Sequence, residues 1–478
     1  MILFEPVRSR TRAPTLVEQV AVALERAITS QLLRPGMAVP SIRAFARDHG
    51  VSNFTVAAAY SRLVASGWLS ARPGAGYRVA MRPSRGRDAV APVRWRPPEI
   101  GASWLLADVF ADHSIPIKSG CGWMPPAWLN ESGLQQSLRQ LARVPGVQIA
   151  RYGHPFGYAP LREHIAEHLG EYGLAVDADH VLLTLGASQA LDIVVRALFR
   201  AGDVVAVETP CYANFLQTLR LSGVTAVGVP RSEDGLCVDA LARIASRGGL
   251  KAVFVNTVLQ NPTGSSLTMA NAFRLLQVAE RYDLRVIEDD VSRELLPELA
   301  PLLAALAGPE RVIYVSGFSK SIAPSVRVGY VVAAPPLLDG FAKVKMTTGL
   351  TTPEMMERTV YQLLRLGHHP AHLRRVRERL REAHDALCDL LDRHGFELFS
   401  RPRAGLFLWA RPPGVWRERG AARLAELALA DGIWLAPGSY FHPERVDEGW
   451  VRFNVAYSLD PALWEFMRRV GAAQARRR

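Results

Sequence analysis

From about residue 115 onward, short runs of apolar residues, many of them β-branched, alternate with segments that have helical periodicity. The runs read HVLLTLG, DVVAVE, KAVFVN, LRVIEDD, RVIYVSG and GYVVAAP, and the segment ASQALDIVVRALF follows the first of them. Continuous apolar runs of this length are typical of strands that are buried on both faces. The pattern therefore predicts an α/β domain whose mostly parallel sheet is covered by helices on both sides.

In such a sheet, ligands bind outside the carboxyl ends of the strands, and the polar residues of this chain lie at those ends. Gly186 opens a helix whose first amides, at Ser188 and Gln189, would point toward an anion. Taken one at a time, these positions are more often structural than functional, as turns, helix starts or core packing. The other polar positions of this kind are Tyr212, Asn261, Asp289, Lys320 and Arg327.

Taken together, these residue types match the needs of one cofactor, pyridoxal 5'-phosphate (PLP). A flat heteroaromatic cation with a phosphate and an aldehyde needs an anion site, a stacking ring and a carboxylate beside the ring nitrogen. It also needs a donor to its phenolic oxygen and a lysine that forms a Schiff base. The chain supplies all five in one predicted sheet, so the sequence predicts a PLP site.

The order of these residues, with NPTG at 261–264 and the pattern SKxxxPxxR at 319–327, resembles the fold-type I aminotransferases across about residues 115–475. The resemblance implies that Lys320 forms the internal aldimine with PLP and that Asp289 keeps the pyridine nitrogen protonated. It implies five further roles. These are a stacking ring at Tyr212, a donor to the phenolic oxygen at Asn261, phosphate ligands at Ser188, Gln189, Ser319 and Arg327, a phosphate ligand for the neighbouring subunit at Tyr152, and a ligand for a substrate carboxylate at Arg452.

The net charge of +12 is concentrated at the front of the chain. Residues 1–96 hold 15 arginines, no lysine and 5 acidic residues, whereas the other 382 residues hold 42 basic and 40 acidic residues. A small basic segment on a nearly neutral body is typical of nucleic-acid binding. A solvated basic linker explains the charge by itself equally well.

The same segment has the pattern of a winged helix-turn-helix. LVEQVAVALERAIT and PSIRAFARDHG predict two helices, and VSNFTVAAAYSRLVASG predicts a third with Ser52 as its N-cap. WLSARPGAGYRVA predicts a hairpin with glycine in its turn. In such a module the third helix enters the major groove, and arginines on the flanking elements contact phosphates.

Residues 15–80 resemble the winged-helix domain of GntR-type regulators through VPSIRAFA and VSNFTVAAAY. Asn53 and Phe54 depart from the family pattern, in which an arginine commonly precedes the Thr-Val pair, and this departure bears on operator preference. The alternative is a helical module that does not bind DNA. The residues expected to contact DNA are Arg43, Ser52, Asn53, Thr55, Arg72 and Gly74.

A GntR-like winged helix followed by an aminotransferase-like body resembles the MocR subfamily of bacterial regulators. The resemblance implies a head-to-tail homodimer that binds operator DNA and senses PLP, or a small amine or amino-acid effector, through aldimine chemistry at Lys320. We predict four segments. They are a DNA-binding domain at 1–80, a Pro/Arg-rich linker at 81–114, a large PLP-binding domain at 115–350 and a smaller C-terminal α+β subdomain at 351–478.

Three positions depart from the aminotransferase pattern. Many members place a tyrosine two or three residues after the ring-nitrogen aspartate, where this chain has Val291 and Ser292, and a serine three residues before the lysine, where it has Gly317. We interpret the chain as a sensor rather than an efficient transaminase. The alternatives are a PLP-dependent aminotransferase with an appended DNA-binding module, and a regulator whose body no longer responds to PLP.

The sequence argues against several other classes of protein. No apolar run is long enough to span a bilayer, and the start MILFEPVRSR lacks the order of a secretory signal, so we expect a cytoplasmic protein that does not contact membranes. The cysteines are far apart and form no C-x-x-C pair, so we expect neither disulfides nor a metal site. They are Cys121, Cys211, Cys237 and Cys388.

Overall fold

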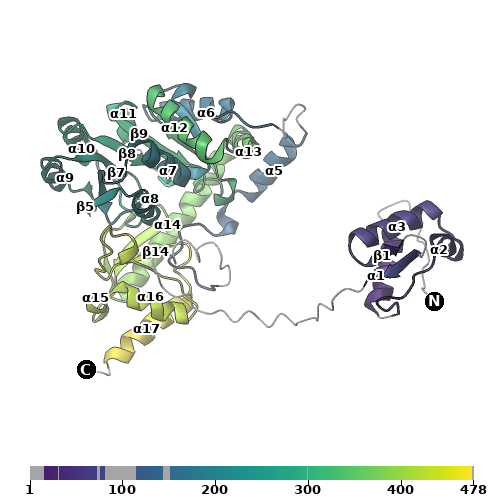
Figure 1. Cartoon of the computed structure of the whole chain (residues 1–478). Coiled ribbons are helices and arrows are strands. Elements are labelled where there is room, and N and C mark those ends of the chain that lie inside the picture. The colour runs from purple at the N-terminus through teal and green to yellow at the C-terminus, as the bar shows by residue number, and fades with distance from the viewer. Residues whose placement is uncertain are drawn as a thin grey trace. The chain divides into compact units, whose positions relative to one another are not determined.

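A computed structural model describes residues 15–30, 32–72, 76–80, 115–143, 151–298 and 300–475. The chain separates into two compact units, Met1–Arg94 and Trp95–Arg478 (Figure 1). Gly74 and the predicted linker at 81–114 lie outside the described residues. The finer division of the second unit at residue 350 stays a prediction.

The first unit is a winged helix-turn-helix, as predicted. It consists of α1 (Leu16–Thr29), α2 (Ile42–His49), α3 (Asn53–Ala65) and an antiparallel hairpin of β1 (Leu69–Arg72) and β2 (Gly76–Val79). Each helix begins with a hydroxyl that accepts a hydrogen bond from the backbone N–H three residues later, at Thr15, Ser41 and Ser52. Gly50 ends α2 with a φ of 63°, a conformation that glycine adopts most easily.

An eight-stranded sheet forms the centre of the second unit, in the order β3-β10-β9-β8-β7-β4-β5-β6. Neighbours from β9 through β5 are parallel, whereas β10 is antiparallel to β3 and β9, and β6 is antiparallel to β5. The prediction of a mostly parallel sheet is confirmed. The strands are β3 (Val181–Thr184), β4 (Val204–Thr209), β5 (Thr225–Ser232), β6 (Gly235–Leu236), β7 (Leu250–Asn256), β8 (Arg285–Asp289), β9 (Val312–Gly317) and β10 (Gly329–Val332).

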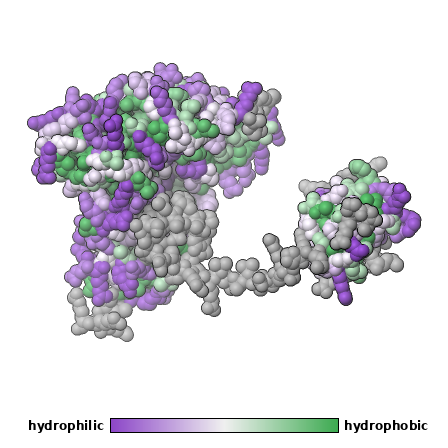
Figure 2. All heavy atoms as spheres, in the orientation of Figure 1, coloured by the Kyte–Doolittle hydropathy of each residue, from purple (hydrophilic) through white to green (hydrophobic). Residues whose placement is uncertain are grey.

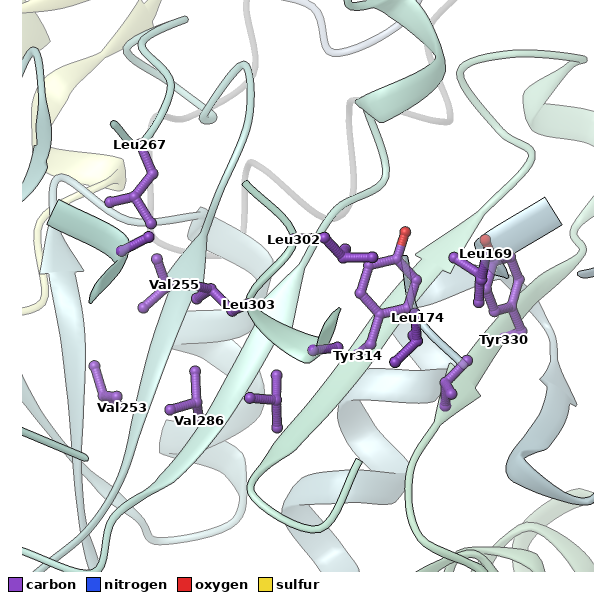
Figure 3. Close-up of a cluster of buried hydrophobic side chains, with 14 of the residues drawn as sticks. Leu169, Leu174, Val253, Val255, Leu267, Val286, Leu302, Leu303, Tyr314 and Tyr330 are labelled. Carbon is purple, nitrogen blue, oxygen red and sulfur yellow. The ribbon is translucent and has the colours of Figure 1, made fainter. Parts of the chain in front are cut away.

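Successive residues of the central strands enter two different cores, because strand side chains alternate between the faces of a sheet. Val253 and Val255 lie on one face, in the same cluster of buried side chains as Val286, Leu303 and Tyr314 (Figure 3). Phe254, between them, belongs to the core on the opposite face. Both faces are therefore buried, which explains the continuous apolar runs in the sequence.

Helices cover both faces of this sheet (Figure 1). The core with Val253 and Val255 includes α6 (Ala159–Glu171), α9 (Val238–Ala245), α10 (Met269–Arg281), α11 (Leu303–Ala307) and α13 (Glu354–Arg365). The opposite core includes α7 (Gly186–Leu198), α8 (Ala213–Leu221) and α12 (Pro335–Gly349). Another helix, α5 (Glu131–Leu141), contacts α13.

The C-terminal part has its own core and a four-stranded antiparallel sheet in the order β11-β12-β14-β13. Its strands are β11 (Glu397–Leu398), β12 (Phe407–Arg411), β13 (Ala436–Pro437) and β14 (Val451–Asn454). Its helices are α14 (His369–Arg393), α15 (Trp416–Arg419), α16 (Ala421–Ala430) and α17 (Pro461–Ala475). Short 3-10 helices lie at Pro126–Trp128, Ala178–His180, Arg293–Leu295, Pro324–Val326 and Gly438–Tyr440.

Hydrophilic side chains are spread over the visible face of the second unit, with smaller hydrophobic areas between them (Figure 2). Among the described residues, no helix has the length and the apolar content that crossing a bilayer requires.

Candidate functional site

Several of the predicted site residues meet at the carboxyl edge of the large sheet. Asp289 is the last residue of β8, and Asn256 is the last residue of the neighbouring β7. The Asn256 side chain donates to the backbone oxygen of Asp289 at 2.7 Å and accepts from the backbone N–H of Asn261 at 2.8 Å. This buried amide therefore joins the ends of two strands to the loop that carries Asn261.

The carboxylate of Asp289 is buried, and one of its oxygens, Oδ1, has no hydrogen-bond partner. Burial, together with the nearby negative charge of Asp290, raises its pKa from 3.8 to about 7. A buried charge without a partner is unfavourable, so this side chain is suited to a ligand that brings a proton or a positive charge.

Lys320 follows β9 and is half-buried. Its ammonium group donates to the backbone oxygen of Gly122, and it also interacts electrostatically with Asp289 and Arg452. Burial, with the positive charge of Arg452 as the next cause, lowers its pKa from 10.5 to about 8. Near pH 8 a large fraction of the amine is therefore neutral, which is the nucleophilic form.

Arg452 lies on β14 and is buried, with its guanidinium against the rings of Phe407 and Phe441 at 4.6 and 4.8 Å. Its Nη1 donates to Oδ1 of Asn261 at 2.7 Å, and its Nη2 donates to the backbone oxygen of Gly120 at 2.6 Å. Its Nε has no partner, and no carboxylate of the described residues is ion-paired with it. The guanidinium can therefore receive a ligand carboxylate.

Arg327 and the start of α7 form an anion site at the other end of this cluster. The Arg327 guanidinium donates to the backbone oxygen of Leu185 at 2.9 Å, next to Gly186. Gly186 has a φ of +72°, and a Cβ on it would lie 2.6 Å from Nη2 of Arg327, so only glycine fits there. The positive end of α7 and a guanidinium thus lie side by side, as phosphate binding requires.

The remaining predicted residues differ in how closely they join this cluster. Tyr212 immediately precedes α8, and its hydroxyl is hydrogen-bonded to the side chains of Ser188 and Asn214. The Gln189 side chain accepts from the backbone N–H of Leu185 at 2.7 Å and so braces the anion site. Ser319 is half-buried next to Lys320. By contrast, Tyr152 is 80% exposed and lines a different cavity, with residues 349–355.

The candidate DNA-contacting residues of the first unit also divide into groups. Arg43 and Asn53 are exposed. The hydroxyls of Ser52 and Thr55 are 2.8 Å apart, and Ser52 also accepts from the Thr55 backbone N–H, so both cap α3. The side chain of Arg72, like Gly74, lies outside the described residues.

Comparison with known proteins identifies both units. The family model described as aminotransferase class I and II matches residues 133–470. The chain belongs to the aminotransferase class I and II family. The model for bacterial regulatory proteins of the gntR family matches residues 16–79, in front of this aminotransferase domain. This fusion is the arrangement of the MocR subfamily, as the sequence predicted.

Relatives of this chain include enzymes and regulators. A 2-aminoadipate transaminase of Thermus thermophilus is 33% identical over 75% of this chain and 90% of the relative. The HTH-type transcriptional regulator TauR of Rhodobacter capsulatus is 28% identical over 96% of each chain. A probable rhizopine catabolism regulatory protein, MocR of Rhizobium meliloti, is 30% identical over 79% of this chain and 77% of the relative. The solved structure of the α-aminoadipate aminotransferase LysN of Thermus thermophilus, complexed with N-(5'-phosphopyridoxyl)-L-leucine, has a TM-score of 0.69 at 30% identity and covers 79% of this chain and 95% of that one.

Aminotransferases of this family depend on PLP, and the side chains present here fit that cofactor. The unpartnered Oδ1 of Asp289 can accept a hydrogen bond from a protonated ring nitrogen, and the anion site formed by Arg327 and the start of α7 can bind a phosphate. The amide nitrogen of Asn261 is available for a phenolic oxygen, because its other amide atom is held by Arg452.

The departures from the aminotransferase pattern have local explanations. A Cβ on Gly317 would lie 3.0 Å from the Cα of Gly329, so the close approach of β9 and β10 favours glycine there. The hydroxyl of the adjacent Ser316 donates to the backbone oxygen of Asp290 at 3.0 Å and so does not replace the missing serine. Val291 and Gly317 line the same cavity of about 450 Å³.

Sequence reasoning missed the buried charges that support this site. Glu208, at the end of β4, forms a fully buried ion pair with Arg231 and accepts from the backbone N–H of Asn256 at 3.0 Å. It thereby fixes the residue that orients Asp289 and Asn261. The signal in the sequence is the glutamate that ends the apolar run DVVAVE, because a carboxylate inside a buried strand must be paired.

Proposed function

We propose that this protein is a PLP-dependent regulator that binds operator DNA and responds to PLP or to an amino-containing effector. Its DNA-binding part is the GntR-type unit, and its sensor is the aminotransferase domain. The similarity to a transcriptional regulator over 96% of each chain supports this function for the fusion as a whole.

When bound, PLP supplies an aldehyde that reacts with amines and an electron-poor ring. Lys320 provides the amine, and Asp289 holds the ring-nitrogen proton at its unpartnered oxygen. Arg327 binds the phosphate, and Tyr212 supplies the ring against the cofactor. Arg452, which is hydrogen-bonded to Asn261, would then receive a carboxylate, so the effector is an amine that carries one.

The observation that carries the proposal is that both effector-binding groups are hydrogen-bonded to one short segment, residues 119–123. Lys320 donates to the oxygen of Gly122, and Arg452 donates to the oxygen of Gly120. PLP on Lys320 and a carboxylate on Arg452 compete for these donors. Occupation of the site therefore releases the segment from one or both side chains.

This segment begins five residues after residue 114, where the predicted linker to the DNA-binding unit ends. It is held to the C-terminal part by backbone hydrogen bonds from Gly120 to Trp434 at 2.7 Å and from Trp434 to Ile117 at 2.8 Å. A change in its hydrogen bonds is therefore passed to the chain that joins the two units. Since hydrogen bonds to charged groups contribute about 1.5–3 kcal/mol, the coupling can reach the usual allosteric range.

We further propose a head-to-tail homodimer in which Tyr152 contributes to the phosphate site of the partner subunit. The exposure of Tyr152, which lines a cavity with residues 349–355, supports this role. Two copies of the GntR-type unit would then engage two half-sites on DNA.

A second candidate function is transamination, which the 33% identity to a transaminase favours. Against rapid turnover, Val291 offers no hydroxyl to the phenolic oxygen, and Ser292 is buried. Repeated turnover needs every proton of the reacting groups to be well placed. We therefore expect a slow half-reaction at most.

The DNA-binding part of the proposal predicts steeply salt-dependent affinity of the full chain for duplex DNA. Each phosphate that an arginine neutralises contributes about −0.9 to the slope of log K against log salt. Arg43→Ala is expected to make this slope less steep by about one and to weaken binding to all sequences alike. The control is Arg247→Ala, an exposed arginine of the other unit, which should leave the slope unchanged. Folded protein that fails to bind DNA even at low salt contradicts the proposal.

A further inference from the structure

The outer face of α3 carries one large apolar side chain. Phe54, in the first turn, is 82% exposed. The core-facing side chains of the same helix, such as Val56, Tyr60 and Leu63, are fully buried. At 3.6 residues per turn, Phe54 lies opposite this buried face, where a recognition helix meets DNA.

The rest of this outer face is small and uncharged. Ala57 and Ala58 are half-buried, and Ser61 is exposed. The helix has one charged residue, Arg62, and its guanidinium lies 3.4 Å from Glu18 of α1. The first turn of the helix, residues 53–56, therefore has no cationic side chain to reach the O6 and N7 acceptors of guanine, and the small residues that follow allow close approach to the floor of the groove.

We infer that α3 reads A·T base pairs, with Phe54 packed against the 5-methyl group of a thymine. Asn53, exposed beside it, has the amide that pairs with the N6 and N7 atoms of adenine. Ser52 and Thr55 position this turn, because their hydroxyls are engaged with each other and with the helix start. The inference rests on the proposed function, since it requires that this helix enter a major groove.

Affinity and sequence preference are then supplied by different elements. Arg43, on α2, and Arg34, before it, are exposed and can neutralise phosphates, which carry no sequence information. Phe54 contributes to binding affinity only at a base pair that presents a methyl group. Removing Phe54 should therefore change the preference between bases while the salt dependence of binding stays the same.

The test uses the full chain and begins with selection of a binding site from a random duplex library. Each thymine of the selected half-site is then replaced, one at a time, by deoxyuridine, which lacks only the methyl group. Burial of one such group corresponds to about fourfold in affinity, so one thymine per half-site should show a loss of about this size. Phe54→Ala should bind the thymine site more weakly than the wild-type protein does, by the same factor. This variant should have equal affinity for the thymine site and the deoxyuridine site.

A matched control is Phe273→Ala, which removes an exposed phenylalanine from α10 of the other unit and should retain the wild-type response to deoxyuridine. The inference is overturned by selected half-sites rich in G·C, by wild-type protein that ignores every deoxyuridine, or by Phe54→Ala that still distinguishes the two bases. Failure to enrich any sequence contradicts the proposed function itself, and this inference with it.

Discussion

Replacing Lys320 by alanine is expected to abolish the covalent attachment of PLP. The chain has five lysines, so borohydride reduction followed by peptide mapping assigns the label without ambiguity. In the wild-type protein the label should lie on Lys320. Because the neutral amine is the reacting form and its pKa is about 8, the rate of labelling should rise between pH 6.5 and pH 9.

Lys345 is a second buried lysine that the labelling experiment must distinguish from Lys320. Burial also lowers its pKa to about 8, but its ammonium donates to the backbone oxygens of Pro155 and Leu183 at 2.7 and 2.8 Å and is 1% exposed. It therefore serves the structure rather than a ligand. Lys343→Ala, at an exposed neighbour, is the control that should label normally. A label on Lys345, or equal labelling of the Lys320→Ala variant, would contradict the assignment.

Replacing Asp289 by asparagine is expected to weaken PLP binding while stabilising the PLP-free protein. Loss of a hydrogen bond between charged groups corresponds to about tenfold to a hundredfold in affinity. In the PLP-free protein, the pKa of about 7 instead of 3.8 means that ionisation of this buried carboxyl opposes folding, by about 4 kcal/mol at pH 8.

The sign of this effect sets its pH dependence. When folding raises the pKa of an acid, its ionisation does not lower the free energy of unfolding below pH 3.8 and lowers it fully above pH 7. The wild-type protein therefore loses stability relative to the variant as the pH rises through this range. Urea unfolding of both PLP-free proteins at pH 5 and pH 8 measures the difference. Unchanged PLP affinity of Asp289→Asn would contradict the role of Asp289.

The sequence predicted the architecture because its signals are local. Buried strands such as Val253–Val255 have continuous apolar runs, and the helix cap at Ser52 is set by residues three positions apart. The direction of β10 was not predictable, because an apolar run has the same appearance in a parallel and an antiparallel strand.

The candidate site was predictable in its residue types but not in its connections. The motif order placed Asp289, Lys320 and Arg452 at one site, whereas the backbone oxygens of Gly120 and Gly122 carry no signal in a sequence. The contact between Lys320 and Gly122 joins residues almost two hundred positions apart. Only the folded chain reveals such contacts, and they join the candidate site to residues 119–123.

The most direct test of the central claim is the affinity of the full chain for its selected DNA site, measured without PLP, with PLP, and with PLP plus a panel of carboxylate-bearing amines. We expect at least one of these additions to change the affinity of the wild-type protein by about fivefold or more, the lower end of typical allosteric coupling, and to leave Lys320→Ala unchanged. Identical DNA affinity in all three states, together with steady-state transamination on the order of ten per second, would contradict the account and establish an enzyme instead.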